Sequence, residues 1–282
     1  MEPIASNRFE VFFEEDSYIA LKNHLYNYQL RKKAVENNFK KGSSGLILEV
    51  GSGISPVMTT SGQIVYSDFS VTGLQILKRT QKRGWYVAAD GVNLPFKSGV
   101  FAHTICSEVL EHIADDMAVI KELARVMRPA GHLILTFPHR KFYFALDDRF
   151  VNHYRRYELS GMENKLLIHG LKPISTQKVL GPLEKITMCI VIGCISLLPK
   201  IGRQAPKTDR TKKPPKGISI NVLTALFKWA NRFYMGLAWL DARIMPRFLA
   251  TVLLIRARLP DSACSEMPAL RMGDQNQAKN HK

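Results

Sequence analysis

The chain has 282 residues, with 40 Lys or Arg against 24 Asp or Glu and a formal net charge of +16. A chain of this length can bury about three quarters of its unfolded surface, which is enough for a complete core. Its four cysteines lack paired ligand spacing, so the sequence argues against a disulfide framework and a zinc site, and we expect no metal. The first residues have neither a basic start nor an apolar stretch, which predicts no signal peptide and a cytoplasmic protein.

The N-terminal region, residues 1–45, is expected to be helical. Within it, Tyr18, Leu21, Leu25 and Tyr28 are spaced among charged residues. This pattern predicts one or two amphipathic helices that lean on a sheet formed by the following segments.

The most informative segment follows directly. Leu46–Val50 is an apolar run with one acid, Glu49, and is typical of a buried parallel strand. Gly51 and Gly53 then allow the backbone to turn sharply and to approach a ligand closely. Pro56 suits the first turn of a helix, whose free N–H groups would face the same ligand.

Four further segments repeat this pattern of strand and polar end. The strands are expected at 63–67, 85–89, 102–106 and 132–137, with a helix over 115–127 before the last. Strands that alternate with helices predict βαβ units and a parallel sheet, which binds ligands at the carboxyl ends of its strands. Glu49, Asp68, Asp90 and Ser107 all stand at such ends, so one site is predicted.

The motifs, in this order, resemble the class I S-adenosylmethionine-dependent methyltransferases, in particular the type 11 group with its quinone, lipid and glycan methyltransferases. The segments that carry the resemblance are Glu49–Gly53, Asp68–Ser70, Asp90 with Leu94–Phe96, Glu108–His112 and Arg125–Gly131. The chain departs from the family pattern at Ser55, Ala102 and Ala130. The last two lie at a strand start and a turn, so they bear on stability more than on the cofactor.

The resemblance implies a doubly wound, Rossmann-like, mostly parallel sheet of seven strands with helices on both faces. It also implies S-adenosylmethionine as the cofactor. Glu49 with Gly51 and Gly53 would hold its methionyl end, Asp68 its ribose, and Asp90 with Gly91 its adenine edge. The full predicted cofactor set is Glu49, Gly51, Gly53, Asp68, Phe69, Asp90, Gly91 and Ser107.

Each of these residues also has a plainer interpretation. Glu49 could merely cap the turn that follows it, Asp68 could cap a helix starting at Val71, and Asp90 could fix its own turn. Glu111 and His112 fall where a helix begins, and a structural hydrogen-bonding role for His112 is the favoured alternative to a catalytic one.

The segment after the fifth strand, residues 138–157, mixes aromatic residues, histidines and charges, as substrate loops do. Its stretch His153–Tyr157 looks like an element of the lipid and glycan members of the group. His153 is the first candidate for the acceptor site, ahead of His139 and His112. Arg156 and Tyr157 could instead brace the next helix.

Residues 181–246 are expected to be an insertion that interrupts a methyltransferase domain formed by residues 46–180 and 247–259. Ile186–Pro199 is almost wholly apolar but spans only ~21 Å as a helix, short of the ~30 Å hydrocarbon core. Seven basic residues follow within 200–216, and 222–244 combine Trp and Tyr with basic residues. This insertion is either a packed hydrophobic lid or a lid that also docks on an anionic membrane. Residues 260–282 are expected to be a disordered tail.

The sequence therefore predicts a methyltransferase that acts on a small or lipid-linked acceptor, such as a lipid, quinone or glycan precursor, peripheral to the cytoplasmic face of a membrane. An oxygen acceptor would need a base, for which a histidine fits. The net charge leaves an RNA methyltransferase as the alternative enzyme, although the apolar insertion does not favour nucleic acid. A non-catalytic membrane adaptor with the same fold is the alternative from another class.

Overall fold

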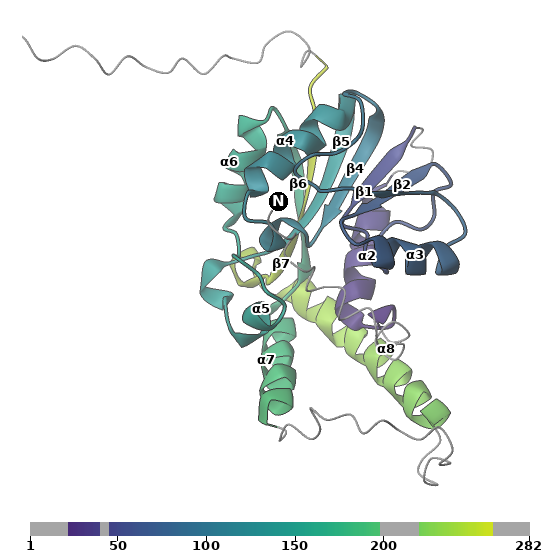
Figure 1. Cartoon of the computed structure of the whole chain (residues 1–282). Helices are drawn as coiled ribbons and strands as arrows, with labels where there is room; N and C mark the ends of the chain where they lie inside the picture. The colour runs from purple at the N-terminus through teal and green to yellow at the C-terminus, as the bar shows by residue number, and fades with distance from the viewer. Residues whose placement is uncertain (1–21, 40–44, 198–219, 262–282) are drawn as a thin grey trace, which may run out of the picture.

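The computed structural model describes residues 22–39, 45–197 and 220–261, and within them one seven-stranded sheet organises the chain (Figure 1). The strand order is β3-β2-β1-β4-β5-β7-β6, in which β7 is antiparallel to both of its neighbours and the other pairs are parallel. The strands are β1 (Ile47–Val50), β2 (Ile64–Asp68), β3 (Trp85–Ala88), β4 (Phe101–Ser107), β5 (Met127–Pro138), β6 (Lys172–Leu180) and β7 (Val252–Arg258).

Helices cover both faces of this sheet. One face packs against α4 (Asp116–Val126) and α6 (Leu159–Ile168), and the other against α2 (Tyr26–Asn38), α3 (Val71–Thr80) and α8 (Ile220–Ile244). Successive residues of β1 therefore alternate between two cores, with Leu48 and Val50 in one and Ile47 in the other. Both faces are apolar because both are buried, which is why β1 has the continuous hydrophobic pattern of a parallel strand. The predicted doubly wound, mostly parallel seven-stranded sheet is confirmed.

One predicted helix does not form. Residues 51–63 contain no helix, although Pro56 suits the start of one. The Glu49 carboxylate accepts hydrogen bonds from the backbone N–H groups of Val57 and Met58 at 2.7 and 3.1 Å. Because both residues also bury their side chains in the core, this segment packs as a loop under α2 rather than as a helix.

Two helices separate the last two strands of the chain. After β6, α7 (Pro182–Leu197) and α8 project beyond one end of the sheet, and α8 returns alongside α2 to reach β7 (Figure 1). No helix in the described part of the chain is long and apolar enough to cross a membrane. Several predicted features lie outside the described residues. They are the first part of the predicted N-terminal helical region (residues 1–21), the basic stretch 200–216 and the tail from residue 262.

Ala130 carries backbone strain within β5, where the register of β5 against β4 shifts between Met127 and His132. Its φ is +61°, a left-handed conformation that L side chains rarely adopt, and it stands where the related family pattern has glycine. We expect Ala130→Gly to raise the free energy of unfolding by about 1 kcal/mol, measured by denaturant titration. The same substitution in the interior of α4, Ala124→Gly, should lower it by a similar amount. A loss of stability in Ala130→Gly would contradict this account.

Candidate active site

A cavity of about 680 Å³ opens at the carboxyl ends of β1, β2, β3 and β4. The crossovers from β1 and β4 leave in opposite directions along the sheet, so a crevice forms between these two neighbouring strands. All eight predicted cofactor residues line this cavity, as do His112 and His153. The structure therefore brings the predicted residues together around one cavity at the strand ends, and their role in binding a cofactor stays a prediction.

The glycine turn after β1 forms one wall. Gly51 has φ +74°, and a Cβ there would lie 2.2 Å from Val109 Cγ2, so no larger residue fits. The Gly53 N–H donates to Asp68 Oδ2 at 2.7 Å, and Asp68 Oδ1 accepts from the Ser70 N–H at 2.8 Å. Burial raises the pKa of Asp68, while these two hydrogen bonds oppose the rise. Each carboxylate oxygen can accept a further hydrogen bond, so the side chain has capacity left for a ligand.

Asp68 does not cap α3, because Ser70 does so by accepting from the Gly73 N–H at 3.0 Å. Glu49, in contrast, has the plainer role that the sequence allowed, since its carboxylate holds the loop after β1. Burial raises the pKa of Glu49 to about 8, despite those two backbone hydrogen bonds. Its position at the cavity wall is compatible with a second role toward a cationic ligand, whose charge would favour the ionised carboxylate.

The remaining predicted cofactor residues stand around the same opening. Asp90 is exposed and accepts from the Val92 N–H at 3.1 Å, which fixes its own turn. Gly91 is buried beside it, Phe69 presents an exposed ring, and Ser107 Oγ shares a hydrogen bond of 2.8 Å with Thr136 Oγ1. An aromatic face and a turn acceptor on one side of the cavity suit the recognition of a flat heterocycle.

The three predicted histidines separate into two environments. His153 and His112 lie against each other, with ring centroids 4.6 Å apart, and both line the cavity. Burial, followed by the neighbouring His153, lowers the pKa of His112 to about 3, so the His112 ring is neutral. His139 is buried elsewhere: its Nδ1 contacts the Ala250 carbonyl at 2.8 Å and it does not line the cavity. The structure therefore does not bring His139 to this cavity, because its ring is engaged by Ala250, in the segment just before β7.

His153 is oriented by a carboxylate. Its Nδ1 lies 2.8 Å from Asp148 Oδ1, and its backbone N–H donates to the Asp148 carbonyl at 2.9 Å. Because an ionised carboxylate can only accept, this contact places the proton on Nδ1 and leaves a lone pair on Nε2. Burial would raise the pKa of Asp148, but the hydrogen bond from His153, the charge of Arg156 and the hydrogen bond from Lys185 lower it well below its usual range.

Asp148 belongs to a buried ionic network that we call the four-charge network: Asp147, Asp148, Arg156 and Lys185. Lys185 Nζ contacts both carboxylates at 2.6 Å, and Arg156 Nε contacts Asp148 Oδ1 at 2.7 Å. The two negative and two positive charges balance, which is the condition for burying them. The network joins α5 (Leu146–Phe150) to α7, so it fixes α7 to the segment that carries His153.

Sequence reasoning missed most of this network. Arg156 and Tyr157 have structural polar contacts, although not with the next helix, α6, as the alternative interpretation held. Arg156 belongs to the network, and the Tyr157 hydroxyl donates to Asp116 Oδ2 of α4 at 2.9 Å. The signal for the rest was a pair of adjacent acids, Asp147 and Asp148, beside aromatic residues, and a lysine at the edge of an apolar run. Neither signal names its partner, because 37 residues separate Asp148 from Lys185.

The methyltransferase domain family matches residues 48–135 of the chain. Within this segment, which runs from β1 into β5, the chain is similar to that family. Among curated proteins, the demethylmenaquinone methyltransferase of Staphylococcus saprophyticus is 31% identical over 113 residues, which cover 37% of this chain and 48% of the relative. That of Corynebacterium kroppenstedtii is 37% identical over 97 residues, covering 33% of this chain and 41% of the relative. The chain thus spans about half the length, or less, of the curated relatives it matches.

Solved structures share the fold over most of the chain. One is a chain from the complex between the Haloferax volcanii Trm112 methyltransferase activator and a putative methyltransferase, with a TM-score of 0.61, 13% identity, and coverage of 91% of this chain and 100% of that one. Another is a methyltransferase from Thermotoga maritima described as a possible histamine N-methyltransferase, with a TM-score of 0.57, 14% identity, and coverage of 89% and 98%. At such identity these likenesses establish the fold alone.

The four-charge network provides a stability test. We expect Lys185→Met to lower the free energy of unfolding by about 3 kcal/mol, because it leaves two buried carboxylates with one cation. Thermal and denaturant unfolding would measure the loss. Lys97→Met, at an exposed lysine outside the cavity, is the matched control and should change stability by less than about 0.5 kcal/mol. Equal stability of the two variants would show that Lys185 is not buried against the acids.

Proposed function

We propose that the chain is an S-adenosylmethionine-dependent methyltransferase that acts on a small or lipid-linked acceptor. The observation that carries the proposal is the cavity itself, which combines a glycine turn and Asp68 on one side with His112 and His153 on the other. Its volume of about 680 Å³ lies within the range of sites that enclose a small-molecule ligand. The family match over 48–135 supports the same reading.

The residues around the glycine turn fit the cofactor. The hydroxyl groups of Ser52 and Ser55 are buried at the cavity wall and have no hydrogen-bond partner among the described residues. Lys22 Nζ lies 3.8 Å from where a Cβ of Gly53 would stand, so a cation borders the turn. A ligand with hydroxyl, ammonium and carboxylate groups would satisfy these positions together with Asp68 and Glu49.

The chemistry asks little of the protein beyond alignment. The sulfonium methyl group of the cofactor is already electrophilic, so the site must hold the acceptor in line and exclude water. An acceptor hydroxyl must also lose a proton, and His153 stands on the acceptor side with Nε2 available. Its orientation by Asp148 supports a role in turnover rather than in cofactor binding.

The acceptor class is proposed from the sequence relatives. Those named above act on demethylmenaquinone by their names, which favours a quinone-like acceptor. An RNA acceptor has no such support. A non-catalytic adaptor is disfavoured because the glycine turn, Asp68 and the oriented His153 all line one cavity.

Cofactor binding is the direct test. Calorimetry with S-adenosylmethionine should give a single site on the parent protein, and Asp68→Ala should weaken it by ~1.5–3 kcal/mol, the scale of lost charge-assisted hydrogen bonds. Asp261→Ala removes an exposed acid that pairs with Arg258 and should bind like the parent. Failure of the parent protein to bind the cofactor would overturn the proposed function.

A membrane surface as the place of action is proposed from α8 and α7. Large apolar side chains recur along one face of α8 and remain exposed: Leu226, Trp229, Phe233, Leu237, Leu240 and Ile244. The spacing of three or four residues makes this a continuous stripe, while Ala238 and Ala242 on the other face are buried. On α7, Ile186 and Ile190 are exposed as well.

Basic residues accompany this apolar stripe. Lys228, Arg232 and Arg243 are exposed on α8, and seven Lys or Arg occur within residues 200–216. An apolar face with aromatic residues and basic edges fits a surface of anionic lipids, where each cation contributes about 1 kcal/mol at low salt. Because both helices project away from the sheet, they could reach a membrane without the domain being displaced (Figure 1).

Vesicle binding tests this part of the proposal. Trp229 and Phe233 are 67% and 64% exposed, so changing both to Ser should not disturb folding. We expect the double variant to bind phosphatidylserine-containing vesicles at least ~10-fold more weakly in sedimentation, because it no longer buries two aromatic rings. Its affinity for the cofactor should equal that of the parent protein.

The control is a second exposed apolar pair, on α6. Leu167 and Ile168 are 52% and 69% exposed, and their change to Ser should leave vesicle binding intact. If the parent protein does not bind anionic vesicles at low salt, the membrane proposal is wrong and α7 and α8 only pack on the domain.

A further inference from the structure

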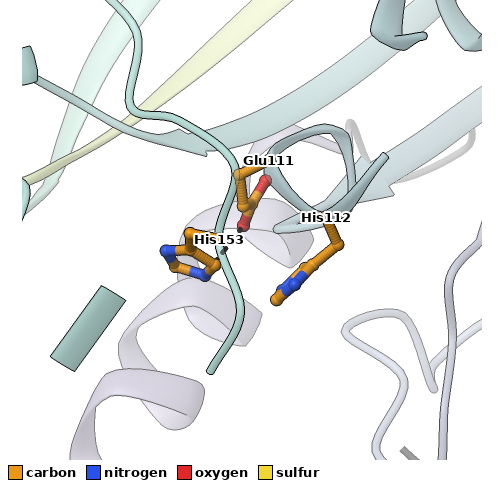
Figure 2. Close-up of side chains that lie close together, drawn as sticks. All are labelled: Glu111, His112 and His153. Carbon is orange, nitrogen blue, oxygen red and sulfur yellow. Dashed lines mark ion pairs between the residues drawn. The ribbon is translucent and has the colours of Figure 1, made fainter. Parts of the chain in front are cut away.

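Three side chains with metal-ligating atoms converge on the acceptor side of the cavity. Glu111 and His112 lie in η2 (Leu110–His112), and His153 lies between α5 and α6. Their potential ligand atoms all lie within 4.8 Å of one another. Figure 2 shows the Glu111 carboxylate between the two imidazole rings, so one ion could contact all three.

The environment of the Glu111 carboxylate points to a bound ion. Its side chain is fully buried, and neither carboxylate oxygen has a hydrogen-bond partner among the described residues. The His153 Nε2 atom lies 3.9 Å from Oε1, which is too long for a hydrogen bond. A buried ionised carboxylate without a partner costs several kcal/mol, so native proteins pair it, protonate it or use it to coordinate a metal.

The neighbouring acid adds to the local negative charge. Glu108 pairs with Arg31 through Oε2 at 3.6 Å, while its Oε1 is buried without a hydrogen-bond partner among the described residues. Its backbone has φ +55°, a conformation that an L residue seldom adopts and that stores strain at functional sites. Two acids thus border the place where an ion would sit, and one of them is held in a strained turn.

Surrounding contacts position His153 and the backbone of Glu111. The Nδ1 atom of His153 contacts Asp148 Oδ1, so in the neutral imidazole the Nε2 lone pair stays free, 3.9 Å from Glu111 Oε1. Ligating histidines in metal sites usually have this carboxylate partner on the other ring nitrogen. The Tyr154 N–H donates to the Glu111 carbonyl at 2.8 Å, so the two segments that supply the ligands are joined directly.

We propose that Glu111, His112 and His153 bind one divalent transition-metal ion at the acceptor side of the cavity. Two imidazoles and one carboxylate form a donor set that suits Zn²⁺ or Mn²⁺ better than Mg²⁺ or Ca²⁺ and leaves coordination positions open. This proposal departs from the expectation from sequence that the chain binds no metal. Cysteine spacing could not indicate this group, because its members are one Glu and two His residues. They also come from segments 41 residues apart in the sequence.

The open positions indicate the class of acceptor, and this step rests on the proposed function. A bound acceptor hydroxyl would have its pKa lowered by the ion and would release its proton to solvent. The acceptor oxygen then forms a bond to the methyl carbon while the carbon–sulfur bond breaks. The electron pair of the broken bond stays on sulfur, which turns the sulfonium into a neutral thioether. The acceptor is therefore a hydroxyl-bearing molecule, and His153 acts as a ligand rather than as the base.

Metal binding is tested on the untagged full chain after removal of metals with a chelator. Titration with Zn²⁺, followed by competition with a chromophoric chelator, should give one equivalent at the site, and excess Mg²⁺ should not displace it. Glu111→Gln keeps the side-chain shape, and His153→Gln keeps a polar side chain of similar length; each should weaken Zn²⁺ binding more than ~100-fold. His169→Ala, which removes a histidine outside the cavity, should bind like the parent protein.

A second readout guards against variants that fail to fold. Zn²⁺ should raise the melting temperature of the parent and of His169→Ala, but not that of His153→Gln. Equal Zn²⁺ affinity in parent and ligand variants, or none in the parent, would overturn the metal site. Binding of S-adenosylmethionine by the stripped protein is measured separately, so the loss of either proposal is distinguishable from the loss of the other.

Discussion

The four-charge network is the interaction on which the acceptor side of the molecule depends. Asp147 and Asp148 belong to α5, Lys185 to the insertion, and Arg156 to the segment before α6, so three elements meet in one buried ionic cluster. Removing any one charge leaves an uncompensated ion in a low-dielectric interior, which costs several kcal/mol. Because Asp148 also orients His153, the network determines the geometry of a cavity wall as well as the packing of α7.

The two sides of the cavity are built by different means. On the cofactor side, the positions follow from the sheet: parallel strands end at one edge, and the β1–β4 crossover point opens a crevice there. Backbone groups position the side chains there, as the hydrogen bond from the Gly53 N–H to Asp68 illustrates. The acceptor side has no such scaffold, since it consists of η2, α5 and a connecting segment. Side-chain charges replace sheet hydrogen bonds as the source of rigidity there.

This difference explains which features the sequence could predict. The strand ends, with Asp68, Asp90 and Ser107, were predictable because hydrophobic period and turn chemistry are local. The loop after Pro56 was not, because it depends on Glu49 reaching two amide groups eight and nine residues away and on burial of Val57 and Met58 under α2. His139 and His153 looked alike in sequence, yet the Ala250 carbonyl engages one and Asp148 orients the other. Their different environments come from interactions that the local sequence pattern does not show.

The lone pair on His153 Nε2 could serve either of two roles in this site, but not both at once. As a base, that lone pair takes the acceptor proton; as a ligand, it is occupied, and the ion acidifies the acceptor instead. The burial of Glu111 favours the ligand, because a base at His153 alone would leave that carboxylate without a partner among the described residues. The same chain of contacts runs from His153 through Asp148 to Lys185 on α7. Any displacement of α7 would therefore alter the orientation of the His153 imidazole, which is the proposed contact with the acceptor.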